Sequence, residues 1–198
     1  MSPLIETIRF QDGRFNNIHY HEQRMQRAMR EVLALSKDVN LAEILNVFPK
    51  PKSGLFKCRV TYDQERNKVE FIPYLARPVN SLKFIDNDTL VYNHKFKDRH
   101  TLEKVFEKRG ECDDILIIQN GFVTDTAYAN IVFKKGKEWV TPSSFLLPGT
   151  QRQYLLDQKL IREEEIKAND IVGFTAFKII NSMLLFEGVE VSTGNIIK

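Results

Sequence analysis

The chain has 198 residues, of which 42% are hydrophobic and 28% are charged, and it contains 14 Phe. This composition supplies enough apolar side chains for a buried core, so it excludes intrinsic disorder as the main state. The net charge is only +3, from 29 basic and 26 acidic residues, which gives no indication of binding to nucleic acid or to a membrane. We therefore expect a globular protein with neither kind of partner.

Targeting and metal-binding signals are also missing from the sequence. Apolar runs such as residues 115–118 have the length of a strand, far short of the roughly 18 residues that a membrane helix needs. The N-terminal segment carries an acid at Glu6 and no basic flank before an apolar stretch, so we expect a cytoplasmic protein without a secretory signal. Cys58 and Cys112 lie far apart and the four His do not cluster beside them, which predicts reduced thiols and no metal site.

The first part of the chain reads as a small α+β unit. Asp12-Gly13 is a hairpin-turn signal, and apolar residues recur with a helical period between residues 19 and 35. The expected elements are a strand (4–10), a helix (19–35), a shorter helix (40–48) and two strands (56–62 and 68–74).

A linker-like stretch at 76–81 precedes a second part that is richer in strands. Asn120-Gly121 between two apolar runs is the strongest hairpin signal in the chain. The expected elements are a helix (98–109), a hairpin (113–125), a strand pair (129–141), a helix (147–161) and a strand (169–175). The sequence therefore predicts two domains, residues 1–80 and 81–198.

Lys95 is the first candidate for chemistry. It follows a strand-like run and directly precedes a predicted helix. A lysine in such a place can point into a cleft, lose solvent and become a nucleophilic amine near neutral pH. Taken alone, it also fits a solvated surface lysine, because buried lysines are rare.

Four further residues carry polar or charged groups in places where a structural or functional reason is expected. Thr150 and Gln151 follow Gly149 at a predicted helix start, where N–H groups and the helix dipole attract phosphate, although an ordinary cap fits the same pattern. Asp125 lies in a predicted strand and faces either a partner or solvent. Arg24 stands near a predicted helix start, where the dipole disfavours a cation by about 0.3–1 kcal/mol.

Seven short segments are informative because of the order in which they occur along the chain. They are ETIR (6–9), HEQR (21–24), KFKDR (95–99), TDTAYAN (124–130), TP (141–142), LPGTQR (147–152) and NDIVGFTAF (169–177). Together they resemble the class IV aminotransferase family, the pyridoxal-phosphate enzymes of fold type IV, over nearly the whole chain. This family includes branched-chain and D-amino-acid aminotransferases and aminodeoxychorismate lyase. The resemblance implies an α+β fold with a small N-terminal α+β domain and a β-rich, cofactor-binding C-terminal domain.

The resemblance also implies a role for particular residues. Lys95 matches the catalytic lysine that forms an imine with pyridoxal 5'-phosphate and then acts as the base. Asp125 stands where the family has a glutamate that pairs with the pyridinium nitrogen, and Arg24 matches the arginine that holds the phosphate. The other residues that it places at the cofactor are Thr126, Asn130, Thr150, Gln151, Thr175 and Ala176. Of these, Asn130 is interpreted as support for the hairpin arm, and Thr175-Ala176 as the second loop on the phosphate side.

Three departures from the family pattern affect the expected function. Asp125 is one methylene shorter than glutamate, and the chain begins almost at the ETIR strand. The Arg-x-His carboxylate clamp of D-amino-acid aminotransferases has no counterpart after the strand 56–62. Residues 175–177, TAF, are also similar to the NAL form of aminodeoxychorismate lyases.

The missing clamp and the TAF segment favour a lyase that converts 4-amino-4-deoxychorismate to p-aminobenzoate and pyruvate. A transaminase acting on branched-chain or D-amino acids with a 2-oxo acid acceptor is the alternative. A protein that binds the cofactor without turnover is a third hypothesis, motivated by Asp125 and the short N-terminus. The resemblance further implies a homodimer and a small-molecule amine substrate.

Overall fold

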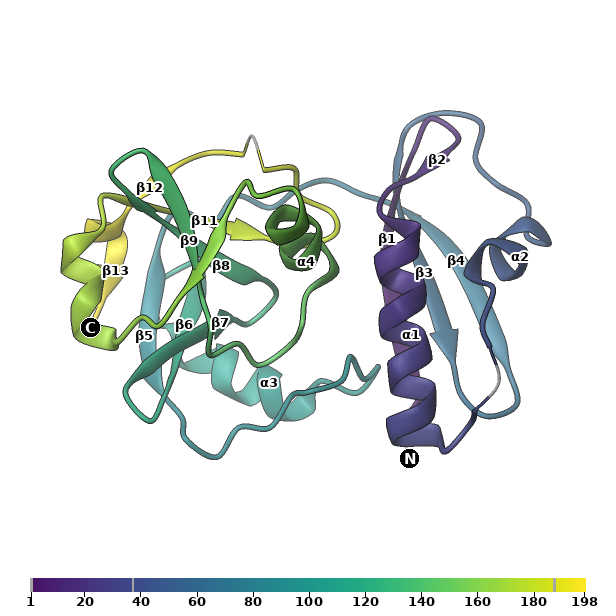
Figure 1. Cartoon of the computed structure of the whole chain (residues 1–198), viewed down its shortest axis with the longest axis horizontal. Coiled ribbons are helices and arrows are strands. Elements are labelled where there is room, and N and C mark those ends of the chain that lie inside the picture. The colour runs from purple at the N-terminus through teal and green to yellow at the C-terminus, as the bar shows by residue number, and fades with distance from the viewer. Residues whose placement is uncertain (1, 37, 187) are drawn as a thin grey trace. The chain divides into compact units, whose positions relative to one another are not determined.

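A computed structural model describes residues 2–36, 38–186 and 188–198. The internal contacts divide the chain into two compact units, one made of residues 1–76 and 94–98 and the other of residues 77–93 and 99–198 (Figure 1). The expected boundary near residue 80 did not anticipate that residues 94–98 pack with the first unit.

The first unit is built on an antiparallel sheet with strand order β2-β1-β3-β4. The strands are β1 (Leu4–Gln11), β2 (Arg14–Phe15), β3 (Leu55–Tyr62) and β4 (Asn67–Pro73). Asp12 and Gly13 both have positive φ, at 47° and 85°, as the two central residues of a type I′ hairpin turn require. The predicted turn and the strand expected before it at 4–10 are confirmed, and the short strand β2 after the turn is an addition.

Two helices, α1 (Ile18–Leu33) and α2 (Leu41–Asn46), share one apolar core with this sheet (Figure 1). Met25, Met29 and Leu33 recur at helical spacing on α1 and are buried. They pack in the same cluster as Leu4 and Ile8 of β1. Side chains of a strand alternate between its two faces, so Glu6, between Leu4 and Ile8, is also directed into this core.

Residues 94–98 join the first unit by pairing with the start of β1. The N–H of Ile5 donates to the carbonyl of Lys95 at 2.8 Å, and the N–H of Lys97 donates to the carbonyl of Pro3 at 2.8 Å. Leu4 and Phe96 form an isolated antiparallel bridge. These bonds fix the backbone of Lys95 beside β1.

The described residues of the second unit form two sheets and two α-helices. The strand orders are β13-β5-β6-β7 and β10-β9-β8-β11-β12. The first sheet contains β5 (Leu82–Asp86), β6 (Asp114–Gln119), β7 (Phe122–Thr126) and β13 (Ile196–Ile197). The second contains β8 (Asn130–Lys135), β9 (Glu138–Pro142), β10 (Arg162–Glu164), β11 (Ala176–Ile180) and β12 (Val191–Ser192).

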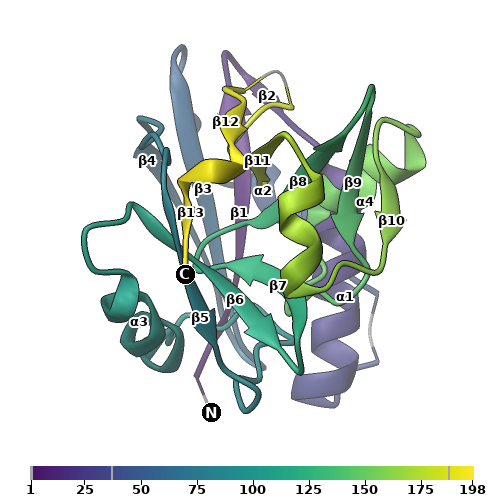
Figure 2. The same cartoon turned by 90° about the vertical axis from the view of Figure 1, so that its left-hand side faces the viewer.

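Strand β6 lies in the middle of this unit, beside β5 and β7 (Figure 2). Leu116 and Ile118 pack in a core with residues of β8, β9 and β11, whereas Ile115 and Ile117 pack with helix α3 (His100–Phe106). Because both faces are covered, this strand is a continuous apolar run instead of an alternating one. Asn120 and Gly121, with φ of 50° and 81°, form the predicted hairpin turn after it.

The predicted strand at 169–175 is wrong. Residues 168–173 form a 3₁₀ helix, η2 (Ala168–Gly173), whose start is capped because the N–H of Lys167 donates to Asp170 Oδ2 at 2.8 Å. Ile171 and Phe174 are buried, three residues apart, while Val172 is 86% exposed. This spacing matches three residues per turn, and strand β11 follows only from Ala176.

The α+β class expected from the sequence is confirmed. Among the described residues, no helix is long and apolar enough to cross a membrane. The remaining α-helix, α4 (Thr150–Asp157), begins at the last residue of the LPGT segment and ends four residues before the expected 161.

Candidate functional site

In the first unit, a buried carboxylate joins β1 to α1. Glu6 on β1 is only 1% exposed and accepts hydrogen bonds from Arg24 Nε at 2.9 Å and Arg24 Nη2 at 2.6 Å. It also bonds to Nδ1 of His21 at 2.6 Å. His21 and Arg24 lie three residues apart on α1, so both side chains reach the same face of the helix. The result is a three-residue polar cluster inside an apolar core.

Charge balance within this cluster fixes its protonation state. Burial by itself would raise the pKa of Glu6, but the charge of Arg24 and hydrogen bonds from His21 and Arg24 lower it to about 2. Burial lowers the pKa of His21; the bond to Glu6 opposes this, and the charges of Arg24 and Lys95 lower it further. Near neutral pH the cluster therefore contains an ionised carboxylate, a guanidinium and a neutral imidazole.

Lys95 belongs to this same part of the first unit. Its backbone is held against Ile5, the residue before Glu6, and its charge acts on His21. The structure thus brings together two predicted site residues, Lys95 and Arg24. It also adds Glu6 and His21, to which the sequence analysis gave no role. The signal for Glu6 was present, because an acid at a core-facing strand position needs a buried partner.

In the second unit, Asp125 lies at the end of β7 and is 4% exposed. Its Oδ1 accepts a hydrogen bond from Asn130 Nδ2 at 2.7 Å. Its Oδ2 accepts from the N–H of Leu146 at 3.1 Å and of Leu147 at 2.9 Å. Of the two interpretations open at the sequence level, the buried and partnered carboxylate is correct.

Burial raises the pKa of Asp125 to about 6, although the hydrogen bonds from Leu147, Asn130 and Leu146 and the charge of Arg152 oppose this effect. A carboxylate that titrates near neutral pH responds strongly to any cation placed beside it. Such groups cluster at functional sites.

The turn between β7 and β8 carries two more predicted residues. Thr126 Oγ1 donates to the carbonyl of Ala129 at 3.2 Å and accepts from the N–H of Ala129 at 3.1 Å, so its hydroxyl closes the turn. Asn130 begins β8 and donates both to Asp125 and, at 2.9 Å, to the carbonyl of Leu147. Asn130 therefore ties the hairpin arm to the loop that precedes α4.

Helix α4 begins at Thr150, directly after Gly149. Glycine has no side chain to cap the helix, and the first intrahelical bond runs from the N–H of Gln153 to the carbonyl of Gly149. Thr150 and Gln151 are both buried in the first turn, where the positive end of the helix dipole lies. The chemistry of this turn suits an anion.

The structure does not bring Thr175 and Ala176 to these residues. Strand β11 runs antiparallel to β8, with Ile180 opposite Asn130, and the N–H of Thr175 donates to the carbonyl of Lys134. Lys134 is four residues along β8 from Asn130, a distance of about 13 Å in a strand. Thr175 and Ala176 therefore lie at the other end of the strand pair.

The turn after β11 reaches the Asn130 end instead. Asn181 Nδ2 donates to the carbonyl of Tyr128 at 3.4 Å, and Asn181 Oδ1 accepts from the N–H of Met183 at 2.9 Å. The sequence signal for this turn was the apolar run AFKII followed by Asn-Ser, which was missed because the strand was expected seven residues earlier.

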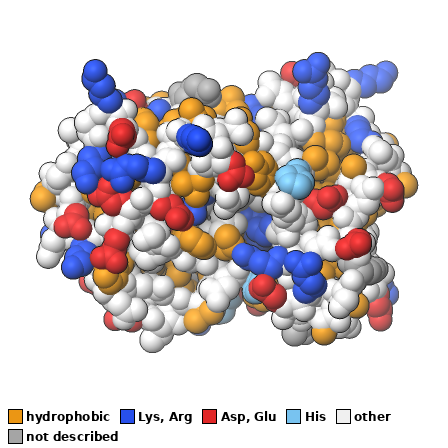
Figure 3. Space-filling view, viewed as in Figure 1, with side chains coloured by type: hydrophobic (Ala, Val, Ile, Leu, Met, Phe, Trp, Pro, Cys, Tyr) orange, Lys and Arg blue, Asp and Glu red, His pale blue; other side chains and the backbone are white. Residues whose placement is uncertain are grey.

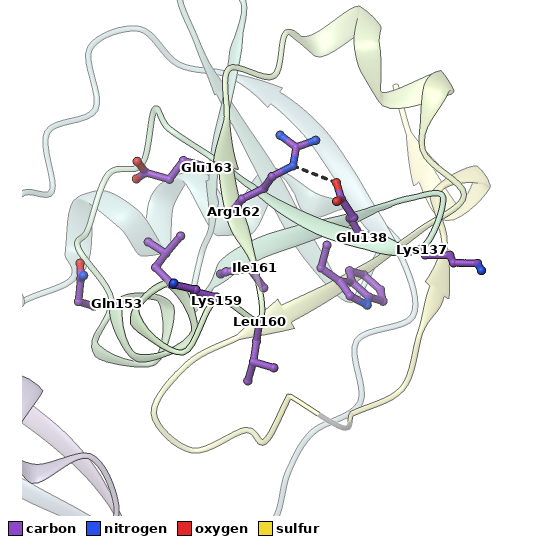
Figure 4. A pocket seen from close by; sticks show the side chains of 10 residues that line it. Lys137, Glu138, Gln153, Lys159, Leu160, Ile161, Arg162 and Glu163 are labelled. Atoms are coloured by element: carbon purple, nitrogen blue, oxygen red, sulfur yellow. Dashed lines mark hydrogen bonds and ion pairs between the residues drawn. The ribbon is translucent and has the colours of Figure 1, made fainter.

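A cavity of about 700 Å³ lies elsewhere in the second unit, along the C-terminal half of α4 and strands β9 and β10 (Figure 4). Leu160 and Ile161 supply apolar lining, and Arg162 donates to Glu138 at 3.1 Å. None of the predicted site residues lines it. Acidic and basic side chains are interspersed on the face shown in Figure 3.

Comparison with known proteins finds a matching family model and a relative of similar length. The family model for amino-transferase class IV matches residues 3–190. A protein of Haemophilus influenzae without a functional name is 37% identical over 185 residues, covering 92% of this chain and 98% of the relative.

Two solved structures extend the comparison. One, from Haemophilus somnus 129pt, is provisionally named 4-amino-4-deoxychorismate lyase; it is 34% identical with a TM-score of 0.86, over 92% of this chain and 97% of that one. The other, from Mesorhizobium loti, is provisionally named an amino-acid aminotransferase and has the same fold, with 22% identity, a TM-score of 0.79 and coverage of 97% and 98%.

Proposed function

Because the chain belongs to the class IV aminotransferase family, whose members are pyridoxal-phosphate-dependent enzymes, we propose that it is a lyase that converts 4-amino-4-deoxychorismate to p-aminobenzoate and pyruvate. The observation that carries this choice is the 34% identity, over nearly the whole chain, to the Haemophilus somnus protein that bears the lyase name. The missing Arg-x-His segment after β3 also supports it.

The carboxylate of Asp125 fits the ring nitrogen of pyridoxal 5'-phosphate. An ionised carboxylate has about four acceptor positions, and the bonds from Asn130, Leu146 and Leu147 use three. The remaining acceptor position is on Oδ1, which receives only the bond from Asn130. A protonated ring nitrogen would donate its N–H to this position. Bound pyridoxal phosphate supplies an electron sink, which a protonated ring nitrogen strengthens. In this proposal Asp125 keeps that nitrogen protonated.

Cationic and dipolar groups fit the phosphate. Arg24 offers a guanidinium charge that its Nε and Nη2 bonds to Glu6 hold in one orientation, and such a charge attracts phosphate. Thr150 and Gln151 offer the first turn of α4. We assign the phosphate to these three residues.

Lys95 is the proposed catalytic residue. Its amine would hold the cofactor aldehyde and, after the substrate amine takes that place, remove the ring proton of the substrate. Because His21 is neutral, its imidazole carries no positive charge that would repel the protonated amine of Lys95. The cluster around Glu6 is therefore suited to a lysine that alternately carries and releases a proton.

We further assign the second loop on the phosphate side to residues 181–183 in place of Thr175 and Ala176. This turn follows β11 and lies at the Asn130 end of the strand, which supports the assignment. It begins with asparagine, as does the NAL form of the lyases with which residues 175–177 were compared.

A transaminase with a 2-oxo acid acceptor is the second candidate, supported by the shared fold with the Mesorhizobium loti protein. A cofactor-binding protein without turnover is the third. In all three proposals the chain acts as a cytoplasmic homodimer.

Incubation of the purified protein with pyridoxal phosphate and 4-amino-4-deoxychorismate separates the three. The lyase releases pyruvate with no acceptor added. Product formation that depends strictly on a 2-oxo acid would replace the lyase by the transaminase. Bound cofactor with no product from either mixture would favour the non-catalytic protein.

A further inference from the structure

Gly149 and Asn130 lie in closer contact than any other residue at position 149 would allow. A Cβ atom built on Gly149 would stand 1.9 Å from Asn130 Oδ1 and 3.1 Å from its Cγ. Real Cβ atoms do not approach other atoms so closely, so the amide of Asn130 occupies the space that a side chain would take.

The backbone of Gly149 gives no other reason for a glycine. Its φ and ψ are −72° and 136°, an extended conformation that every L-residue adopts. The amide of Asn130 is also held in place, because Nδ2 donates to Asp125 Oδ1 at 2.7 Å and to the carbonyl of Leu147 at 2.9 Å. These two bonds oppose a movement of the amide away from position 149.

We propose that Asn130 is a positioning residue that holds the Asp125 carboxylate against the start of helix α4, and that position 149 is glycine to admit its amide. This inference rests on the proposed function, in which Asp125 serves the cofactor ring and α4 serves the phosphate. Asn130 touches the three parts concerned: the end of β7, the carbonyl of Leu147 and the backbone of Gly149.

The bond from Asn130 also contributes to the pKa of Asp125. The carboxylate is buried, and the groups that favour its ionised form are the amide of Asn130, the N–H groups of Leu146 and Leu147, and the charge of Arg152. Asn130 is the only uncharged side chain among them, so its removal should make ionisation harder without changing the local charge.

A double-mutant cycle tests the contact in the cofactor-free protein. Gly149→Ala should lower the thermal midpoint strongly, whereas Gly149→Ala combined with Asn130→Ala should be no less stable than Asn130→Ala alone. Gly173→Ala is the matched control, because a Cβ there meets nothing within 4 Å. Equal effects of Gly149→Ala with and without Asn130, or an effect as small as that of Gly173→Ala, would overturn the proposal.

Carboxyl ¹³C NMR measures the pKa of Asp125. This pKa shows whether Asn130 positions the Asp125 carboxylate or only stabilises the fold. It should shift upward in Asn130→Ala and in Gly149→Ala but stay unchanged in Gly173→Ala. Loss of stability with no shift would leave Asn130 a merely structural residue and overturn its positioning role.

Titration with pyridoxal phosphate then tests the link to function. Asn130→Ala should bind it about tenfold more weakly than the wild type. An unchanged affinity together with a shifted pKa would uphold the positioning of Asp125 and count against the proposed role of Asp125 at the ring.

Discussion

The carboxylate of Glu6 accepts hydrogen bonds from both Nε and Nη2 of Arg24, at 2.9 and 2.6 Å, inside the apolar core of the first unit. Two buried charges of opposite sign thereby neutralise each other where an isolated charge would be costly. The pair also holds the planar guanidinium in one orientation. An arginine that is to bind phosphate is thus oriented before the ligand arrives, which reduces the entropy lost on binding.

Replacement of Glu6 by Gln should destabilise the fold by about 3–5 kcal/mol at pH 7, because Arg24 would lose its buried counter-ion. The folded-state pKa of Glu6, about 2, lies below its ordinary value of 4.5. Its contribution is therefore complete above about pH 4.5 and is lost as the pH falls toward 2. The gap between wild type and variant in urea unfolding should be smaller at pH 3 than at pH 7.

Glu31→Gln provides the control on helix α1, since this carboxylate is 54% exposed and its ion pairs are with Arg27 at 3.8 Å and His94 at 3.3 Å. Its effect should be within about 1 kcal/mol. If Glu6→Gln lowers the free energy of unfolding equally at both pH values, or by no more than Glu31→Gln does, the ionic role of Glu6 is contradicted.

Replacement of Arg24 by Lys should weaken binding of pyridoxal phosphate about tenfold, because a lysine ammonium cannot keep the two bonds to Glu6 that hold the positive charge in place. Pyridoxal, which has no phosphate, should bind the variant as well as the wild type. Fluorescence titration with both ligands measures the difference, with Arg27→Lys one turn away as the control. Equal losses for the two ligands would show that Arg24 supports the fold and not the phosphate.

Affinity for pyridoxal phosphate should depend on the charge of Asp125. Because burial raises its pKa to about 6, the ionised form that pairs with a ring cation is lost as the pH falls below about 6. Binding measured between pH 5 and 8 should weaken at the acid end, and Asp125→Asn should bind more weakly with that acid dependence removed. The same acid dependence in the variant would exclude Asp125 as its source.

Much of the architecture follows from local patterns. The Asp12-Gly13 and Asn120-Gly121 turns were predictable because a type I′ turn requires two consecutive positive φ values, which these residues tolerate. Helix α1 was predictable from its apolar period. The strand expected at 169–175 failed because apolar residues three apart in a short segment fit a 3₁₀ helix as well as a strand.

The site was harder to predict because its contacts join distant segments. Asp125 and Lys95 could be matched to a family, but the sequence does not show that Glu6 bonds to Arg24, eighteen residues further on. The reason for Gly149 is likewise invisible in the sequence, since it depends on an amide nineteen positions away. Thr175 and Ala176 were placed at the cofactor by comparing TAF with the NAL form of the lyases, whereas the register of β11 against β8 puts them at the opposite end of the strand pair from Asn130.

The central claim is that Lys95 carries the cofactor, and borohydride reduction followed by peptide mass spectrometry tests it most directly. The holoenzyme should lose its visible absorption band on reduction and retain a pyridoxyl group on the peptide that contains Lys95. Lys95→Ala should show neither the band nor the modified peptide, whereas Lys97→Ala, at an exposed neighbouring lysine, should show both. A pyridoxyl group on another lysine, or a band that survives in Lys95→Ala, would contradict the account.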